Sequence, residues 1–184
     1  MPAPVSPRVL LLPGWQNSGP AHWQSRWEAL YGDLRVEQHD WMHPLRGDWV
    51  MRLDEVVQAQ AGDVVVVAHS LGCLLVGAWA AQTRLAHRVH GALLVAPGDP
   101  QQPELSAVLH SWIPMALPRL PFPSLLLGSH NDPYCSLERA RSFADALGAR
   151  WLDWGHAGHI NADSGLGDWP QGRALLADFL NPQT

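Results

Sequence analysis

Lysine is absent from this sequence of 184 residues, and all twelve of its Lys and Arg positions are arginine. The absence excludes enzymes that form a Schiff base on lysine, P-loop nucleotide hydrolases and enzymes with a Ser-Lys dyad. Seventeen acidic residues outnumber the twelve arginines, and the formal net charge is −5. Nucleic-acid binding depends on clustered basic side chains, so we expect no nucleic-acid partner.

Cysteines and long apolar runs are also scarce. The two cysteines, Cys73 and Cys135, are too few for a disulfide framework or a cysteine metal site. No apolar stretch approaches the roughly 20 residues of a membrane-spanning helix. The start of the chain, Met1 to Arg8, shows no signal-peptide pattern. We therefore expect a cytoplasmic protein without membrane association.

Short, unbroken apolar runs alternate with amphipathic segments along the chain. Unbroken hydrophobicity is typical of strands covered on both faces, as in a parallel sheet. The expected strands are Val9–Leu12, Val64–Ala68, Ala92–Ala96 and Ser124–Leu127, with weaker candidates at Arg35–His39 and Arg150–Asp153. The expected helices are Pro20–Tyr31, Asp48–Ala61, Leu71–Leu85, Leu137–Leu147 and Pro170–Leu180. This order predicts one α/β domain over residues 1–184, with a mostly parallel open sheet of about six strands and helices on both faces.

The carboxyl ends of the strands are where chemistry is expected, because ligands of such sheets bind beyond those ends. The polar residues directly after each apolar run are therefore the candidates for a functional site. The stretch Pro97–Pro123 holds seven prolines and is expected to form a long connection over these ends. Within it, a short helix is expected around Glu104–Trp112.

A candidate nucleophile follows four consecutive valines. The segment Ala68–Gly72 (AHSLG) matches the G-x-S-x-G nucleophile elbow, with alanine in the first glycine position. In that turn a serine hydroxyl is exposed at the edge of the sheet, and small flanking residues let strand and helix cross closely. The alternative is that Ser70 only caps the following helix, which serine favours in any case.

An acid and a base should follow the serine in chain order. Asp132, in the loop after the run that ends at Leu127, is favoured as the acid, and Asp99 is the rival because it also follows an apolar run. His159 is favoured as the base, with His156 as the alternative in the same glycine-containing segment. His69, inside the elbow, is expected to pack or to support these residues.

The remaining site predictions concern an oxyanion hole and the pocket walls. Backbone N–H groups of Leu71, directly after the nucleophile, and of Trp15, in the loop after the first strand, are the expected donors to the oxyanion. Ten tryptophans stand against two tyrosines and three phenylalanines. Trp15, Trp41 and Trp112 are the candidate aromatic walls of the substrate pocket, and each could equally be a core residue.

These segments resemble the α/β-hydrolase superfamily and, more narrowly, the small serine hydrolases of the retinoblastoma-binding protein 9 family and their bacterial relatives. The matching segments are Leu12–Trp15 (LPGW), Ala68–Gly72 (AHSLG), Asn131–Tyr134 (NDPY), Gly158–Asn161 (GHIN), Ser164–Gly167 (SGLG) and Trp169–Pro170. The resemblance implies a hydrolase without a large cap domain, with Ser70, Asp132 and His159 as its triad. The mammalian member carries a Leu-x-Cys-x-Glu motif. Leu71–Leu75 (LGCLL) lacks its glutamate, so we expect no retinoblastoma-type partner.

The leading functional hypothesis is a serine hydrolase that cleaves a small ester, thioester or amide through an acyl-enzyme on Ser70. It requires a small-molecule acyl substrate and no cofactor or metal. One alternative is a binding or regulatory module that keeps the fold without activity. Another is a metal site formed by His156, His159 and Asp163, whose spacing is geometrically possible although glycines interrupt the segment.

Overall fold

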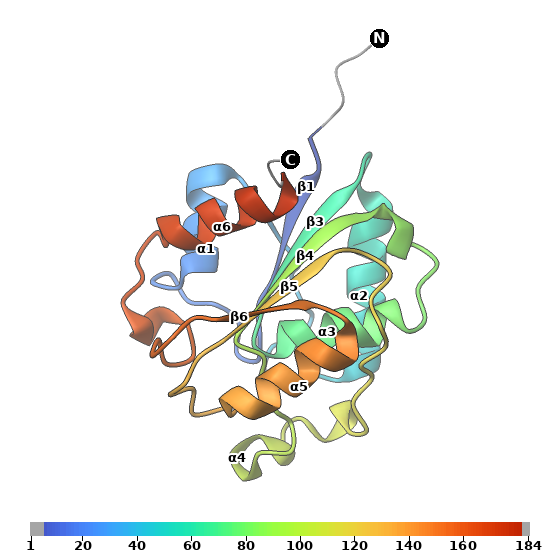
Figure 1. Cartoon of the computed structure of the whole chain (residues 1–184). Coiled ribbons are helices and arrows are strands. Elements are labelled where there is room, and N and C mark those ends of the chain that lie inside the picture. Colours follow the sequence, from blue (N-terminus) through green and yellow to red (C-terminus); the bar gives the residue numbers. More distant parts are fainter. Residues whose placement is uncertain (1–5, 182–184) are drawn as a thin grey trace.

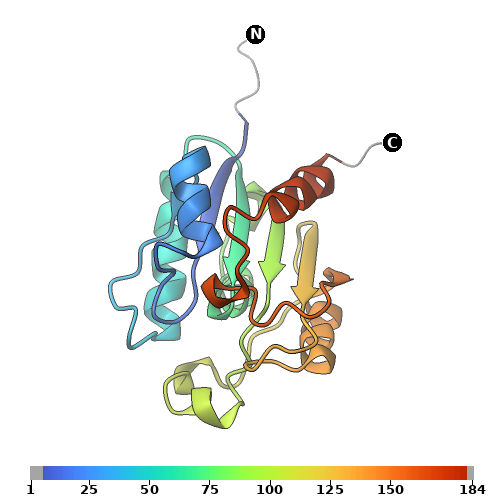
Figure 2. The ribbon, with the colours of Figure 1, turned by 90° about the vertical axis from the view of Figure 1, so that its left-hand side faces the viewer.

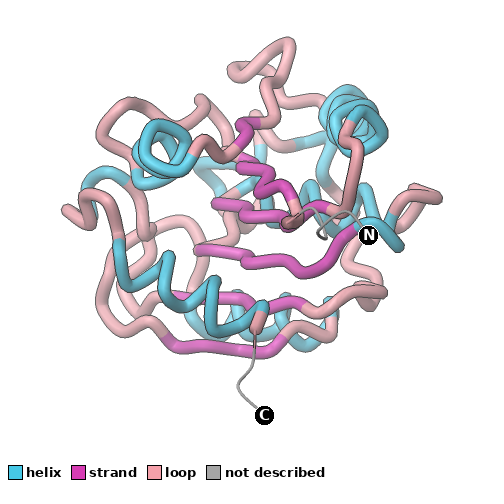
Figure 3. Tube along the Cα trace, turned by 90° about the horizontal axis from the view of Figure 1, so that it is seen from above, coloured by secondary structure: helices cyan, strands magenta, loops and turns pink. Residues whose placement is uncertain are grey.

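The computed structural model describes residues 6–181, so most of the Met1–Arg8 segment lies outside the described residues. Its centre is a six-stranded sheet in the order β2-β1-β3-β4-β5-β6, and every neighbouring pair is parallel. The strands are β1 (Arg8–Leu12), β2 (Leu34–Arg35), β3 (Val64–His69), β4 (Val89–Val95), β5 (Ser124–Gly128) and β6 (Arg150–Asp153). Viewed from above, they form one twisted layer with helices around it (Figure 3).

Helices cover both faces of the sheet (Figures 1 and 2). One face carries α1 (Trp23–Tyr31) and α6 (Pro170–Leu180), and the other carries α2 (Arg46–Ala59), α3 (Leu71–Ala80) and α5 (Leu137–Leu147). The fold class predicted from the sequence is therefore confirmed. No helix within residues 6–181 is long and apolar enough to cross a membrane.

The four consecutive valines of β3 explain why the sheet needs helices on both sides. Successive side chains of a strand point to opposite faces. Val64 and Val66 accordingly join the core cluster beneath α2, α3 and α5, whereas Val65 and Val67 join the cluster beneath α1 and α6. Every residue of β3 is buried, so an alternating apolar–polar pattern would leave polar side chains without water.

Two expected strands have clearly different bounds in the structure. The strand expected at Arg35–His39 is wrong: β2 pairs with β1 only at Leu34 and Arg35. Pro13 follows the end of β1 and has no N–H, so it cannot extend the ladder. The strand expected at Ala92–Ala96 begins earlier, at Val89, because a register irregularity at Val64/Val65 lets Val89 pair with β3.

The helices expected at Pro20–Tyr31 and Asp48–Ala61 are Trp23–Tyr31 and Arg46–Ala59 in the structure, and two other helical predictions need a larger correction. The helix expected over Leu71–Leu85 ends at Ala80. Beyond it the Thr83 hydroxyl donates to the Asp54 carboxylate and accepts the Leu85 N–H, so these hydrogen bonds replace those of a continued helix. The short helix expected around Glu104–Trp112 is two pieces, α4 (Pro103–Ser106) and the 3-10 turn η2 (His110–Trp112). Both lie in the connection after β4, and no larger cap domain interrupts residues 6–181.

Candidate active site

Ser70 occupies a strained turn between β3 and α3. Its backbone has φ 55° and ψ −122°, a conformation that residues with a Cβ rarely adopt. The neighbouring strand β1 and the helix α3 approach each other so closely that a Cβ added to Gly72 would lie 2.3 Å from the Leu12 carbonyl oxygen. The Ser70 side chain makes no capping hydrogen bond to α3, so the alternative of a simple helix cap is wrong.

A chain of hydrogen bonds links Ser70 to a histidine and an aspartate from distant parts of the sequence. The Ser70 hydroxyl lies 2.9 Å from Nε2 of His159, and Nδ1 of His159 lies 2.9 Å from Oδ2 and 3.0 Å from Oδ1 of Asp132. A neutral His159 that donates its Nδ1–H to the carboxylate has an unprotonated Nε2 facing the hydroxyl. Both His159 and Asp132 have buried side chains, so little water competes for these bonds.

The two rival residues lie elsewhere. Asp99 pairs with the Arg139 guanidinium at 2.9 Å, and its backbone N–H donates to the Tyr134 carbonyl. His156 is exposed, and its ring stacks on His130 with 4.8 Å between the ring centroids. The structure therefore brings Asp132 and His159 to Ser70, but neither Asp99 nor His156.

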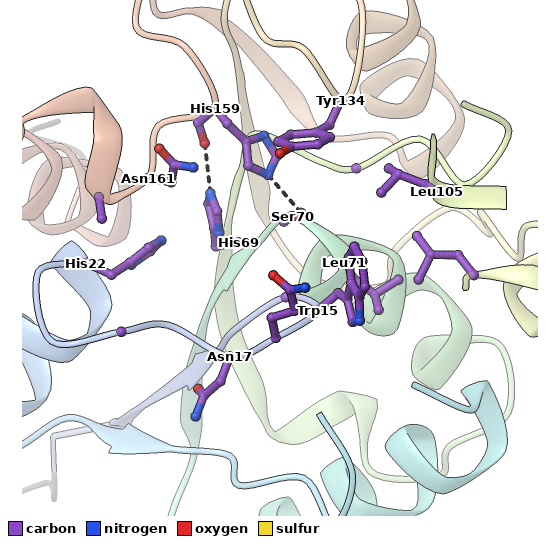
Figure 4. Close-up of a pocket in the computed structure, with 16 residues that line it drawn as sticks. Trp15, Asn17, His22, His69, Ser70, Leu71, Leu105, Tyr134, His159 and Asn161 are labelled. Carbon is purple, nitrogen blue, oxygen red and sulfur yellow. Dashed lines mark hydrogen bonds between the residues drawn. The ribbon is translucent and has the colours of Figure 1, made fainter. Parts of the chain in front are cut away.

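The His69 ring lies beside the His159 ring, and the His22 ring packs against His69 in turn, with 4.7 Å between their centroids (Figure 4). His69 donates its Nε2–H to the His159 carbonyl oxygen at 2.8 Å, and the two rings are 4.7 Å apart. His22 caps α1, because its Nδ1 accepts the backbone N–H of Gln24. Burial lowers the pKa of His22 to about 3 and holds the pKa of His69 well below its usual value. Both rings are therefore neutral at pH 7.

These buried neutral rings predict a loss of stability in mild acid. Between pH 7 and pH 5 an unfolded histidine takes up a proton, whereas folded His22 stays neutral down to its pKa of about 3. Acid therefore favours unfolding, and His22 alone should lower the free energy of unfolding by about 2 kcal/mol over that interval. His69 acts in the same direction. Urea unfolding at the two pH values measures the drop.

A pair of His→Asn variants isolates the contribution of His22 to this drop. In His22→Asn the amide oxygen can still cap α1, but the titrating ring is gone, so the drop should shrink by about 2 kcal/mol. The exposed His87, in the 3-10 turn η1 (Ala86–Arg88), provides the matched control, and His87→Asn should leave the drop as in the wild type. An equal drop in all three proteins would contradict the assignment of His22 as a buried neutral ring.

The backbone around Ser70 offers two uncommitted N–H groups at the positions expected for an oxyanion hole. In the loop after β1, the N–H of Gln16 donates to Trp41 and that of Asn17 donates to Gly14. Within residues 6–181 the N–H groups of Trp15 and Leu71 have no such acceptor. Gly14 brings the loop close, because a Cβ there would lie 3.2 Å from the Leu71 nitrogen and 2.8 Å from the Ser70 Cβ.

Ser70 lines a pocket of about 280 Å³. Trp15 lines it, as expected, but the prediction that Trp112 forms a wall is wrong. Trp112 is 2% exposed, donates its indole N–H to the Pro44 carbonyl, and packs edge-on against Trp49. Trp41 also packs edge-on against Trp49 and does not line the pocket either. The sequence could not separate these roles because an indole ring suits a core and a pocket wall equally.

Comparison with known proteins decides the family. Residues 9–178 match the serine hydrolase family. The chain belongs to this family. It is an enzyme of the α/β-hydrolase superfamily, as the sequence motifs predicted, whereas the narrower resemblance to the retinoblastoma-binding protein 9 family stays a prediction. No curated protein matches the sequence of this serine hydrolase.

Solved structures give the same fold. A protein described as a YdeN-like hydrolase from Pectobacterium atrosepticum is 32% identical, with a TM-score of 0.81 over 94% of this chain and 90% of that one. The ydeN gene product from B. subtilis is 18% identical, with a TM-score of 0.72 over 95% and 98% of the two chains. An esterase from a Rhodococcus species is 15% identical, with a TM-score of 0.68 over 97% and 91%. The last two likenesses concern the fold alone.

The pocket of this serine hydrolase contains residues that the sequence analysis missed. Tyr134 packs edge-on against the His159 ring at 4.7 Å. Leu105 and Leu109 line the pocket from the connection after β4. Their spacing of four residues, in the stretch already expected to cross the strand ends, was the available signal. His22 and Asn161 also line the pocket. Asn161 ends the GHIN segment that the sequence analysis singled out, but without a role in the pocket, whereas nothing in the local sequence marks His22.

Neither the cysteines nor a metal site enters this arrangement. Cys73 and Cys135 are free and buried, and burial raises the pKa of both thiols, that of Cys135 to about 12. Both stay protonated at neutral pH, which makes them poor nucleophiles. No group of three metal-ligating side chains comes together within residues 6–181, so the alternative site of His156, His159 and Asp163 is not assembled.

Proposed function

We propose that this serine hydrolase cleaves a small ester, thioester or amide through an acyl-enzyme on Ser70. The observation that carries the proposal is the continuous hydrogen-bonded chain from Ser70 through His159 to Asp132, at 2.9 Å for each link. A serine hydroxyl is a weak nucleophile unless a base removes its proton as it attacks. The unprotonated Nε2 of His159 is positioned for that transfer, and Asp132 holds the ring in the required tautomer.

In the first half-reaction the Ser70 oxygen bonds to the substrate carbonyl carbon while its proton moves to Nε2 of His159. The carbonyl oxygen becomes an oxyanion, which accepts hydrogen bonds from the N–H groups of Leu71 and Trp15. The tetrahedral intermediate then collapses. The bond to the leaving group breaks, and the leaving atom takes the proton from His159. An ester on Ser70 and a free alcohol, thiol or amine result.

Water completes the reaction in a second half that mirrors the first. His159 accepts a proton from the water as its oxygen bonds to the acyl carbon. Collapse of the second tetrahedral intermediate breaks the bond to Ser70, and His159 returns the proton to the serine oxygen. The products are a carboxylic acid and the free enzyme, so the cycle needs no cofactor.

Labelling with a fluorescent fluorophosphonate tests the nucleophile directly, because this probe forms a bond only with an activated serine. The wild type and His156→Ala should be labelled. Ser70→Ala should not be labelled, and His159→Ala should be labelled far more slowly, because the hydroxyl then lacks its base. Measurement of label incorporation against time on a gel, with circular dichroism as the check on folding, is sufficient.

Two results would contradict the proposal. A folded wild-type protein that takes up no label would favour the alternative of a binding module that keeps the fold without activity. Equal labelling of Ser70→Ala and the wild type would place the reactive serine elsewhere in the chain.

A further inference from the structure

The pocket beside Ser70 has two chemically different sides (Figure 4). Leu71 and Leu105 lie on an apolar side, and Leu109, from the same connection as Leu105, also lines the pocket. His22, His69 and Asn161 form a polar side: the His22 and His69 rings are 4.7 Å apart, and Figure 4 draws Asn161 on the same side of the pocket. A substrate that reaches both sides must combine an apolar part with a part that forms hydrogen bonds.

Two side chains on the polar side each have a free hydrogen-bond donor, because the acceptor atom of each already has a partner within the protein. Nδ1 of His22 accepts the Gln24 N–H, so the neutral ring carries its proton on Nε2. This Nε2 is buried and has no partner. Oδ1 of Asn161 accepts the Asp163 N–H as the cap of the 3-10 turn η3 (Ala162–Ser164), which leaves its amide Nδ2 free. In Figure 4 that nitrogen lies on the side of Asn161 that faces His69.

The same side also offers a hydrogen-bond acceptor. Nε2 of His69 donates to the His159 carbonyl, so its Nδ1 is unprotonated in the neutral ring. Among residues 6–181 no donor reaches this Nδ1. Two donors and one acceptor on one wall match a hydroxyl group, which accepts and donates at once.

The charge of the pocket lining limits the class of ligand that the pocket can bind. The described pocket lining contains no Arg, Asp or Glu, and its two imidazoles outside the hydrogen-bonded chain, those of His22 and His69, are neutral at pH 7. Arg35, whose charge acts on His22, already bonds Asn17, Ser25 and Glu28. A carboxylate or an ammonium group would lose its hydration here without gaining a counter-charge.

We propose that the side formed by His22, His69 and Asn161 binds an uncharged hydroxyl group of the substrate, while the three leucines contact its apolar part. The hydroxyl oxygen accepts hydrogen bonds from Nδ2 of Asn161 and Nε2 of His22, and the hydroxyl donates one to Nδ1 of His69. This assignment rests on the proposed function, because it names the class of substrate for the same site: a small carboxylic ester with a hydroxyl group in its acyl or alcohol part.

Matched ester pairs test the proposal, with kcat/KM measured by titration of the released acid. In the alcohol arm, 3-hydroxypropyl butanoate is compared with n-butyl butanoate, and in the acyl arm ethyl 3-hydroxybutanoate is compared with ethyl 3-methylbutanoate. Each pair exchanges one methyl for a hydroxyl of similar size. We expect the hydroxyl ester to be preferred about tenfold in one arm, the effect of roughly one net hydrogen bond. The preferred arm identifies the part of the substrate that carries the hydroxyl.

Two variants connect this preference to the polar side. His22→Asn keeps an acceptor for the Gln24 N–H but removes the Nε2 donor, and Asn161→Ser keeps a capping oxygen but removes the amide donor. Each should lower the preference at least about threefold. His87→Asn and Asn181→Ser make the same exchanges outside the pocket and should leave the preference unchanged. Either pocket variant suffices if the other does not fold.

The outcomes separate this inference from the proposed function. If no ester is hydrolysed, or if Ser70→Ala hydrolyses them equally well, the proposed function itself fails. If hydrolysis depends on Ser70 but neither hydroxyl ester is preferred, only the present inference is overturned. A preference that both pocket variants retain overturns it as well, because His22 then merely packs against the His69 ring. Monoethyl succinate carries a carboxylate. If it were hydrolysed faster than the hydroxyl esters, the argument that the uncharged pocket disfavours a charged substrate would be overturned.

Discussion

His159→Ala is expected to lower kcat for ester hydrolysis by about a million-fold. In the proposed mechanism the imidazole transfers a proton in both half-reactions. Within residues 6–181 no other base is hydrogen-bonded to the Ser70 hydroxyl, because the ring of His69 makes its hydrogen bond to the His159 backbone. What remains should be the contribution of substrate binding and the oxyanion donors. Steady-state kinetics with p-nitrophenyl butanoate measures the change. Urea unfolding shows whether the variant is folded.

His156→Ala provides the matched control for this experiment. His156 lies three residues away, is exposed and stacks on His130, so its removal should change kcat by less than about threefold. The reverse pattern, with the large loss in His156→Ala, would mean that the loop rearranges before the reaction and that the observed geometry is not the reactive one.

Gly72→Ala is expected to lower the free energy of unfolding by about 3 kcal/mol. The added methyl would lie 2.3 Å from the Leu12 carbonyl oxygen, far inside van der Waals contact. That oxygen cannot move aside easily, because Leu12 is held in register with Ala68 in the centre of the sheet. The helix α3 must therefore shift, and with it Ser70. Urea unfolding measures the cost, and the esterase assay measures the displacement of the nucleophile.

Gly47→Ala separates this effect from the general preference of helices for alanine. Gly47 lies in the first turn of α2, and a Cβ there would meet nothing within 4 Å. This substitution should raise the free energy of unfolding by about 0.5–1 kcal/mol. If Gly72→Ala were as stable as Gly47→Ala, the close crossing of β1 and α3 would not constrain the elbow.

Much of the fold was readable from local patterns. Leu137–Leu147, Arg150–Asp153 and Pro170–Leu180 have in the structure the bounds predicted for them. The predicted bounds were wrong where long-range pairing decides. The strand Val89–Val95 begins before its apolar run, and β2 ends at Arg35 because its neighbour ends. Patterns of hydrophobicity report burial along a segment, whereas the length of a ladder depends on the strand beside it.

By itself, the sequence determined the α/β architecture and the position of Ser70 in a strand–turn–helix segment, because both follow from residues adjacent in the chain. The preference for Asp132 over Asp99 and for His159 over His156 depends on two long-range contacts. His159 bonds Asp132, 27 residues away in the chain, and Ser70, 89 residues away. Only the tertiary structure shows which side chains meet over such separations. It also decided that Trp112 belongs to the core and that His22 and Asn161 face the pocket. The physical reason is that a side chain's partners are set by how the elements pack, which its neighbours in the chain do not specify.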